Sequence, residues 1–114
     1  MASRLTPKEF ARYLDRDKHC LHCGTTDDTL VPQHRANRGA GGSKSRGSNP
    51  ANVVVLCSRV NTLLEADARW ATLGRVNGWK LNSWDDPAIK PVYDAYTRVW
   101  WVLDSAYGRT EYKN

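Results

Sequence analysis

Residues 29–61 read TLVPQHRANRGAGGSKSRGSNPANVVVLCSRVN. Two apolar, β-branched runs flank residues 35–48, which have no apolar side chain larger than alanine and whose charged side chains are all Arg or Lys. This pattern predicts two strands, residues 29–34 and 52–57, joined by a long exposed loop. Loops of such length inside compact domains are usually functional. We expect a helix to follow, with Ser58 as its N-cap, and to run to about Val76, where Asn77-Gly78 stops it.

The segments on either side of this unit carry their own signals. Thr6 is typical of an N-cap, Pro7 of a first helical position and Glu9 of a capping box, which predicts a short helix to about Asp17. Its apolar face would consist of Phe10, Tyr13 and Leu14. Near the C-terminus, PVYDAYTRVWWVLD predicts a β-hairpin that turns near residues 95–98. We interpret most of the tryptophans after the helix as core residues, namely Trp79, Trp84, Trp100 and Trp101.

Size and composition favour a single domain over residues 1–114. The chain has 114 residues, of which 40% are hydrophobic, enough for one modest core. We divide it into an N-terminal helix (1–18), a central unit (19–76) and an aromatic hairpin extension (77–114). No apolar run has the length of a membrane span, and the opening MASRLTPKEF lacks the apolar centre of a secretory signal. We therefore expect a cytoplasmic protein with no membrane partner.

The charge balance favours a polyanionic partner. Lys and Arg total 17 against 12 Asp and Glu, which gives a net charge of +5 and a pI of about 9.3. Such values are typical of nucleic-acid-binding proteins, although many basic proteins bind no polyanion.

The cysteines predict metal binding rather than disulfides. There are three, an odd number, and two of them form a Cys20-x-x-Cys23 pair followed by Gly24. Glycine permits the tight turn that directs two sulfurs at one ion. Thiolate metal binding in a reducing compartment explains this usage better than a disulfide framework does.

Three residues follow in a fixed order: His34 closes the first strand, Asn52 opens the second and Asn61 lies in the first turn of the helix. This order resembles that of the HNH nuclease family. The segments CLHCG, QHRANRGAGGS, NPANVVVLCSRVN, GWKL, PVYD and WWVLD are similar to those of small HNH proteins from actinobacterial phages, over about residues 19–104. The resemblance implies an α+β fold built on a ββα-metal (His-Me) finger, in which two strands and a helix clamp one divalent ion. It also implies a phage origin and hence a location in the host cytoplasm.

By this resemblance His34 is the general base of a DNA endonuclease. A neutral imidazole, with an ordinary pKa of about 6.5, can take a proton from the attacking water near neutral pH. Asn52 would hydrogen-bond to the backbone across the long loop and so fix the orientation of His34. Taken alone, each of these residues would more often be a surface, turn or cap residue.

The same resemblance assigns one Mg²⁺ or Mn²⁺ ion to the amide oxygens of Asn61 and Gln33. The family usually has Asp or His before the general base, whereas this chain has Gln33. A glutamine oxygen is a weaker ligand than a carboxylate. The departure predicts weak metal affinity without DNA, or a nuclease that has lost its activity.

Cys20, Cys23 and Cys57 match three of the four thiolates of the zinc knuckle found in many HNH proteins. The fourth position holds Val60. Structural zinc is nearly always four-coordinate, so His19 or His22 would have to complete the site, or the site has lost its metal.

The expected partner is double-stranded DNA, held by five basic residues: Arg35, Arg38, Lys44, Arg46 and Arg59. Two alternatives remain open. The chain could be an HNH-fold DNA-binding module that no longer cleaves, or an adaptor for phage packaging or DNA-processing proteins that uses Trp100 and Trp101 as its partner surface.

Overall fold

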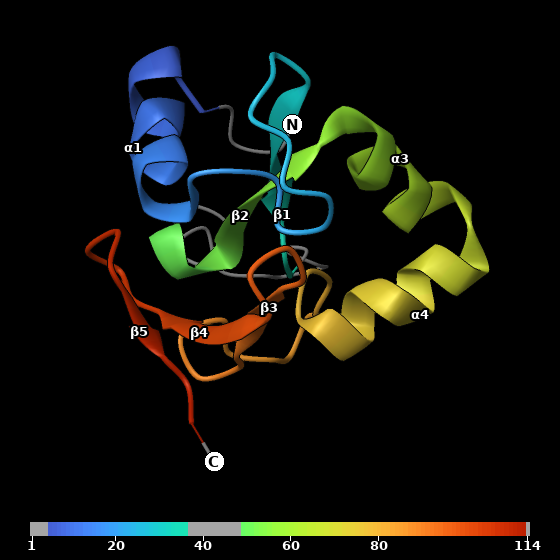
Figure 1. Cartoon of the computed structure of the whole chain (residues 1–114). Helices are drawn as coiled ribbons and strands as arrows, with labels where there is room; N and C mark the ends of the chain where they lie inside the picture. The colour runs from blue at the N-terminus through green and yellow to red at the C-terminus, as the bar shows by residue number, and fades with distance from the viewer. Residues whose placement is uncertain (1–4, 37–48, 114) are drawn as a thin grey trace.

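The computed structural model describes residues 5–36 and 49–113 and has an α+β fold (Figure 1). Three helices are interspersed with two small antiparallel sheets in the described part of the chain. Their order is α1 (Pro7–Asp17), β1 (Leu30–His34), the short 3₁₀ helix η1 (Pro50–Asn52), β2 (Val53–Cys57), α3 (Ser58–Ala66), α4 (Ala68–Asn77), β3 (Val92–Asp94), β4 (Val99–Leu103) and β5 (Arg109–Glu111).

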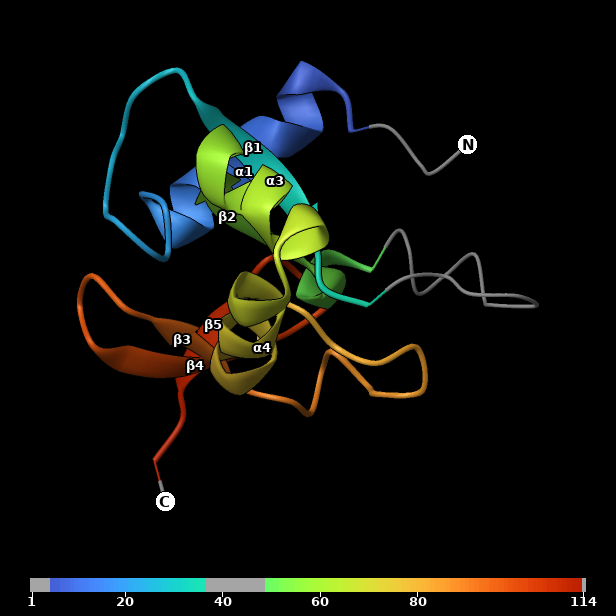
Figure 2. The ribbon, with the colours of Figure 1, turned by 90° about the vertical axis from the view of Figure 1, so that its right-hand side faces the viewer.

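The two predicted central strands are confirmed and pair as an antiparallel hairpin. Leu30 lies opposite Cys57 and His34 lies opposite Val53. All five residues of β2 are buried, because helices cover both faces of the hairpin. Figures 1 and 2 show α1 on one face and α3 on the other. Alternate residues of β2 therefore belong to two cores.

The larger core lies on the α3 face. Val54 and Leu56 of β2 pack there with Val60 and Leu64 of α3 and with the fully buried Trp79. On the other face Val53 and Val55 pack against Tyr13 of α1, with Phe10 and Leu14 half-buried beside them. The predicted apolar face of the first helix is thus confirmed.

Local signals set the ends of α1 as predicted. Thr6 Oγ1 accepts a hydrogen bond from the Glu9 backbone N–H at 3.1 Å, and the Glu9 carboxylate accepts one from the Thr6 N–H at 2.9 Å. This capping box satisfies two N–H groups that the first helical turn leaves without a partner. The helix ends at Asp17, which was also its predicted end.

The single helix expected over residues 58–76 is wrong, because the chain breaks at Asp67. Asp67 has an extended backbone, and its carboxylate accepts hydrogen bonds from the N–H groups of Arg69 and Trp70. It is therefore the N-cap of a second helix, α4, rather than an interior residue. Cys57, not Ser58, holds the N-cap position of α3 and makes no side-chain capping bond. The predicted stop is confirmed, since Gly78 ends α4 with a φ of 77°.

The C-terminal hairpin turns over residues 95–98 as predicted, and β5 adds a third strand that the sequence did not suggest. Trp79 is fully buried, and Trp101 packs against the main core while half-buried. Trp100 is also half-buried and lies 4.8 Å from the Tyr93 ring, between ring centroids. Trp84 is the exception to the core interpretation, because 77% of it is exposed.

The prediction that Arg35 contacts DNA is wrong, because its side chain is a structural clamp. It is 1% exposed, and its guanidinium donates hydrogen bonds to five backbone carbonyls. They belong to three separate segments: Ala51 in η1, Gly78 after α4, and Pro87, Lys90 and Pro91 before β3. Burial, assisted by the nearby charge of Arg16, lowers the pKa of Arg35 to about 9, so it remains a cation at neutral pH. No donor of this side chain is left for a phosphate.

Replacing Arg35 with leucine should destabilise the fold by at least about 3 kcal/mol, because several buried carbonyls lose their donors together. Urea unfolding followed by tryptophan fluorescence measures the loss. Arg69→Ala is the matched control: the Arg69 side chain is 94% exposed, so its removal should change stability by no more than about 0.5 kcal/mol. Equal unfolding midpoints for Arg35→Leu and the wild type would show that the clamp does not hold these segments.

Candidate active site and thiol cluster

The central hairpin and α3 position the three motif residues. His34 is the last residue of β1 and is half-buried, Asn52 directly precedes β2, and Asn61 lies in the first half of α3. Side chains alternate along a strand, and cross-strand partners share a face. His34 pairs with Val53 and Gln33 with Val54, and these valines belong to opposite cores. His34 therefore leaves the end of the hairpin on the face opposite Gln33.

Gln33 and Asn61, the two expected metal ligands, are in direct contact. Asn61 Nδ2 lies 2.7 Å from Gln33 Oε1. The orientation of Gln33 follows from its surroundings, because its Nε2 group donates to two carbonyls, His34 O and Trp79 O, each at 3.2 Å. Only the oxygen of Gln33 can then face Asn61, so Asn61 must present its amide nitrogen. The Asn61 oxygen consequently points away from Gln33.

The hydrogen bonds expected of Asn52 across the long loop are present. Its Oδ1 accepts from the Ala36 N–H at 2.8 Å, and its Nδ2 donates to the Ala36 carbonyl at 3.0 Å. The Asn52 carbonyl also accepts from the Arg35 N–H at 2.7 Å. Asn52 is fully buried, so these bonds are shielded from water. They hold the two ends of the loop together directly beyond His34.

The other basic residues divide into two groups. Arg59 is exposed and sits over the Trp70 ring, 5.8 Å from its centroid, so its charge is available to a partner. Arg38, Lys44 and Arg46 lie outside the described residues.

A contact that the sequence analysis missed lies one turn further along α3. The Glu65 carboxylate accepts a hydrogen bond from Lys80 Nζ at 2.9 Å. Glu65 follows Asn61 by four residues, a spacing that puts both side chains on one face of the helix. That spacing was the available signal, but only the structure shows which basic residue faces it.

The sulfur atoms of Cys20, Cys23 and Cys57 all lie within 4.8 Å of one another and could hold a metal ion. Gly24 follows the pair with a φ of 79°, as the predicted tight turn requires. Two backbone N–H groups donate to the Cys20 sulfur, from His22 at 3.4 Å and from Cys57 at 3.2 Å. Bonds of this kind stabilise a thiolate and orient it toward a metal.

The cysteines differ in their tendency to ionise. Burial raises the pKa of Cys20 to about 11. Burial also acts to raise the pKa of Cys23, but hydrogen bonds from the Thr25 backbone and from the other two thiols outweigh it, so this pKa is lowered. Cys23 is exposed, whereas the other two cysteines are buried. The cluster thus opens to solvent at Cys23.

Neither histidine joins this cluster, so of the two alternatives the one with His19 or His22 as the fourth ligand is not supported. Among the described residues, the cysteines alone form a group with metal-ligand geometry. His19 Nε2 lies 2.7 Å from Asp94 Oδ2 and is committed to that contact. The His22 ring packs edge-on against Trp70 and Trp79, at centroid distances of 5.1 and 5.7 Å. Burial, with help from the Arg59 charge, lowers the pKa of His22 and keeps it neutral among these rings.

No protein-family model, curated protein or solved structure matches this chain. Among the described helices, none combines the length and the apolar character needed to cross a membrane. The functional assignment therefore depends on the residues themselves.

Replacing Asn52 with aspartate should destabilise the protein by about 1–3 kcal/mol near pH 8, because a buried carboxylate cannot donate to the Ala36 carbonyl. The loss should shrink as the pH falls. Burial raises the folded-state pKa of the new carboxyl, and its protonated form can donate again. Urea unfolding of both proteins at pH 5 and pH 8 measures the difference. A loss that is larger at pH 5 would contradict the assigned hydrogen bond.

Proposed function

We propose that this chain is a metal-dependent DNA endonuclease in which β1, β2 and α3 act as a ββα-metal unit of the HNH class. The observation that carries the proposal is the contact between Gln33 and Asn61. Gln33 directly precedes His34, the first motif residue, and Asn61 is the third motif residue. A strand and a helix bring them together across 28 residues of sequence. The Asn52 pairing with Ala36, beside His34, adds the middle motif position to the same unit.

The oxygen ligands that these residues offer are of the kind that a hard divalent cation prefers, but neither side chain is negatively charged. Gln33 and Asn61 offer amide oxygens, which Mg²⁺ and Mn²⁺ accept as ligands. The Asn61 nitrogen faces the Gln33 oxygen, so an ion held by both oxygens would require the Asn61 amide to turn over and this hydrogen bond to be replaced by two ion–oxygen contacts. Both groups are neutral, so the phosphate of bound DNA would supply negative charge. A bound ion would stabilise the charge that develops on the phosphate during hydrolysis.

His34 would accept the proton of the attacking water, a task that requires a neutral imidazole near pH 7. The hydrogen bonds of Asn52 hold the chain directly after His34 and thereby limit the movement of its ring. His34 and the two amides occupy opposite faces of the hairpin end. A phosphate that the base and the ion both act on would therefore have to lie across the end of the hairpin.

Double-stranded DNA is the proposed substrate because of charge. The net charge of +5 and the exposed Arg59 favour a phosphate backbone, and the sequence adds Arg38, Lys44 and Arg46. Binding should weaken steeply as salt concentration rises. Backbone contacts of this kind carry no sequence information, so we expect weakly specific cleavage.

Supercoiled plasmid should be nicked or linearised in Mg²⁺ or Mn²⁺ and stay intact in EDTA. His34→Ala should lower the rate by about 10²–10⁴-fold, the usual contribution of general base catalysis. Agarose gels report the conversion. Thr62→Ala, at an exposed position of α3, is the control and should cut as the wild type does. Cleavage that persists in His34→Ala would refute the assigned base.

One observation favours a second function, DNA binding without cleavage. Position 33 holds an amide whose oxygen already accepts a hydrogen bond, where the family usually has an ionisable ligand. On this alternative the plasmid stays intact while a gel shift reports salt-sensitive binding.

We also propose that the thiol cluster holds a structural zinc ion. Three thiolates and one solvent molecule would complete a tetrahedral site, because Cys23 is exposed and Val60 packs in the core at the fourth position. The ion would link the turn after α1 to the junction between β2 and α3, and so stabilise the hairpin that carries His34.

Titration with Co²⁺, which reports thiolate ligation through its absorption spectrum, should show one ion per chain. Cys23→Ser should weaken binding, whereas Val60→Cys should strengthen it by about tenfold or more, since it adds a fourth thiolate. Affinity should rise with pH: the pKa of Cys20, about 11, lies above neutrality, so the metal must displace a proton. A spectrum without thiolate-to-metal bands would refute the site.

A further inference from the structure

The proposed divalent site has two neutral ligands, and protein sites for Mg²⁺ or Mn²⁺ usually include at least one carboxylate. The structure places a carboxylate one helical turn from Asn61. Glu65 lies on the same face of α3, and its side chain is 63% exposed. A hydrated ion could therefore reach it from solvent.

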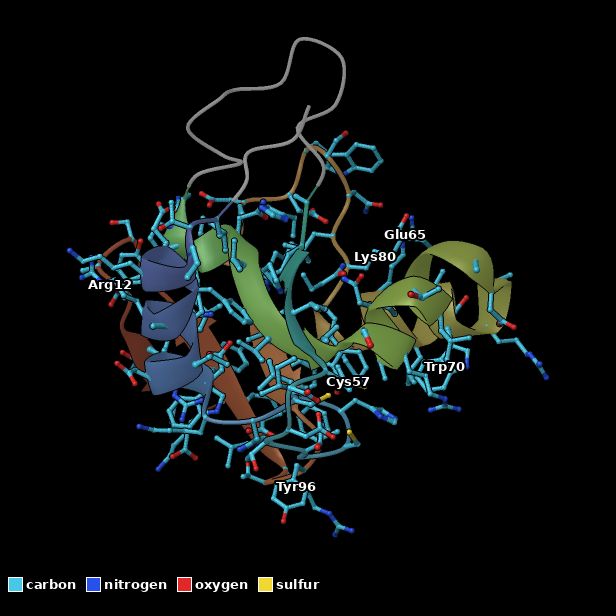
Figure 3. The ribbon with its side chains drawn as sticks, turned by 90° about the horizontal axis from the view of Figure 1, so that it is seen from above. Arg12, Cys57, Glu65, Trp70, Lys80 and Tyr96 are labelled. Carbon is cyan, nitrogen blue, oxygen red and sulfur yellow. The ribbon has the colours of Figure 1, made fainter. Side chains whose placement is uncertain are left out.

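Two parallel contacts join this face of α3 to the rest of the site. Asn61 bonds to Gln33, and Glu65 bonds to Lys80. The two contacts are neighbours, because Gln33 also donates to the carbonyl of Trp79, the residue before Lys80. Figure 3 shows Glu65 and Lys80 directed toward each other between α3 and the chain that follows α4.

Lys80 is held much more firmly than an ordinary surface lysine. Its side chain is only 14% exposed, and its backbone N–H donates to the Gly74 carbonyl at 3.1 Å. The ammonium group is thus kept next to the Glu65 carboxylate. A cation in that place neutralises the carboxylate and competes with any metal ion for its oxygens.

We infer that Glu65 is the carboxylate ligand of the divalent ion, and that Lys80 is its counter-ion until the ion binds. The inference rests on the proposed function and extends it to two residues outside the motif. When an ion takes the carboxylate, Lys80 loses its partner and becomes available to a phosphate of the DNA. If Lys80 competes with the ion for Glu65, removing Lys80 should strengthen metal binding. If the ion pair is merely structural, removing Lys80 should leave metal binding unchanged.

The test uses Mn²⁺ alone, without DNA, added to the full chain with its thiol cluster saturated with Zn²⁺. Electron paramagnetic resonance of free Mn²⁺ gives the dissociation constant. Glu65→Gln should weaken binding by about 10-fold or more, because even outer-shell partners of a metal site contribute that much. Lys80→Met should strengthen it by about two- to fivefold, the range expected when an ion pair with a largely exposed carboxylate is removed. Glu111→Gln, at an exposed position of β5, is the matched control and should bind as the wild type does.

Wild-type affinity in Glu65→Gln, weaker or unchanged binding in Lys80→Met, or no Mn²⁺ binding by the wild type at millimolar concentration would each overturn the inference. Thermal unfolding of each variant shows whether it is folded. If Lys80→Met does not fold, Lys80→Gln takes its place. The nuclease proposal fails separately. Mn²⁺ binding as expected with an intact plasmid would refute cleavage alone, whereas His34-dependent cleavage that Glu65→Gln leaves unchanged would refute the role of Glu65 alone.

Discussion

The buried guanidinium of Arg35 is the interaction on which the rest of this structure depends. A cation in a protein interior requires compensation, and here five backbone carbonyls provide it. Because they come from η1, from the end of α4 and from the segment before β3, one side chain fixes three parts of the chain that share no sheet. Arg35 also follows His34 directly, so the residue that organises the fold holds the chain beside the candidate base.

This coupling explains why the candidate site is built from residues far apart in sequence. Gln33 and Arg35 are on the same face of the chain, two residues apart, and both donate to carbonyls at or after the end of α4, namely Trp79 and Gly78. The segment after α4 is thereby held against β1, and it carries Lys80 to Glu65. Loss of the Arg35 clamp would therefore disturb the site as well as the core.

Local signals made much of the fold predictable. The capping box of α1, the β-branched run of β2 and the glycine that ends α4 each act within a few residues. The burial of Arg35 and its role as a clamp could not be predicted, since the carbonyls that it contacts lie 16 to 56 residues away in sequence. The helix break at Asp67 was not predicted, because the helical spacing of apolar residues continues across it. Its capping hydrogen bonds are nevertheless local. For the site, the order of His34, Asn52 and Asn61 suggested a motif, but the Gln33–Asn61 contact and the exclusion of His19 and His22 from the thiol cluster required the structure.

The amide of Gln33 matches the hydrogen-bonding groups around it. A carboxylate there would face two carbonyl oxygens, His34 O and Trp79 O, with no proton to share, and that arrangement would be repulsive. Glutamine donates to both and still orients Asn61 with its oxygen. The packing that makes an amide favourable at position 33 also brings the next segment, with Lys80, up to α3. The amide at position 33 and the contact between Lys80 and the Glu65 carboxylate are therefore two consequences of one arrangement, in which the strand offers a neutral oxygen and the helix a charged one.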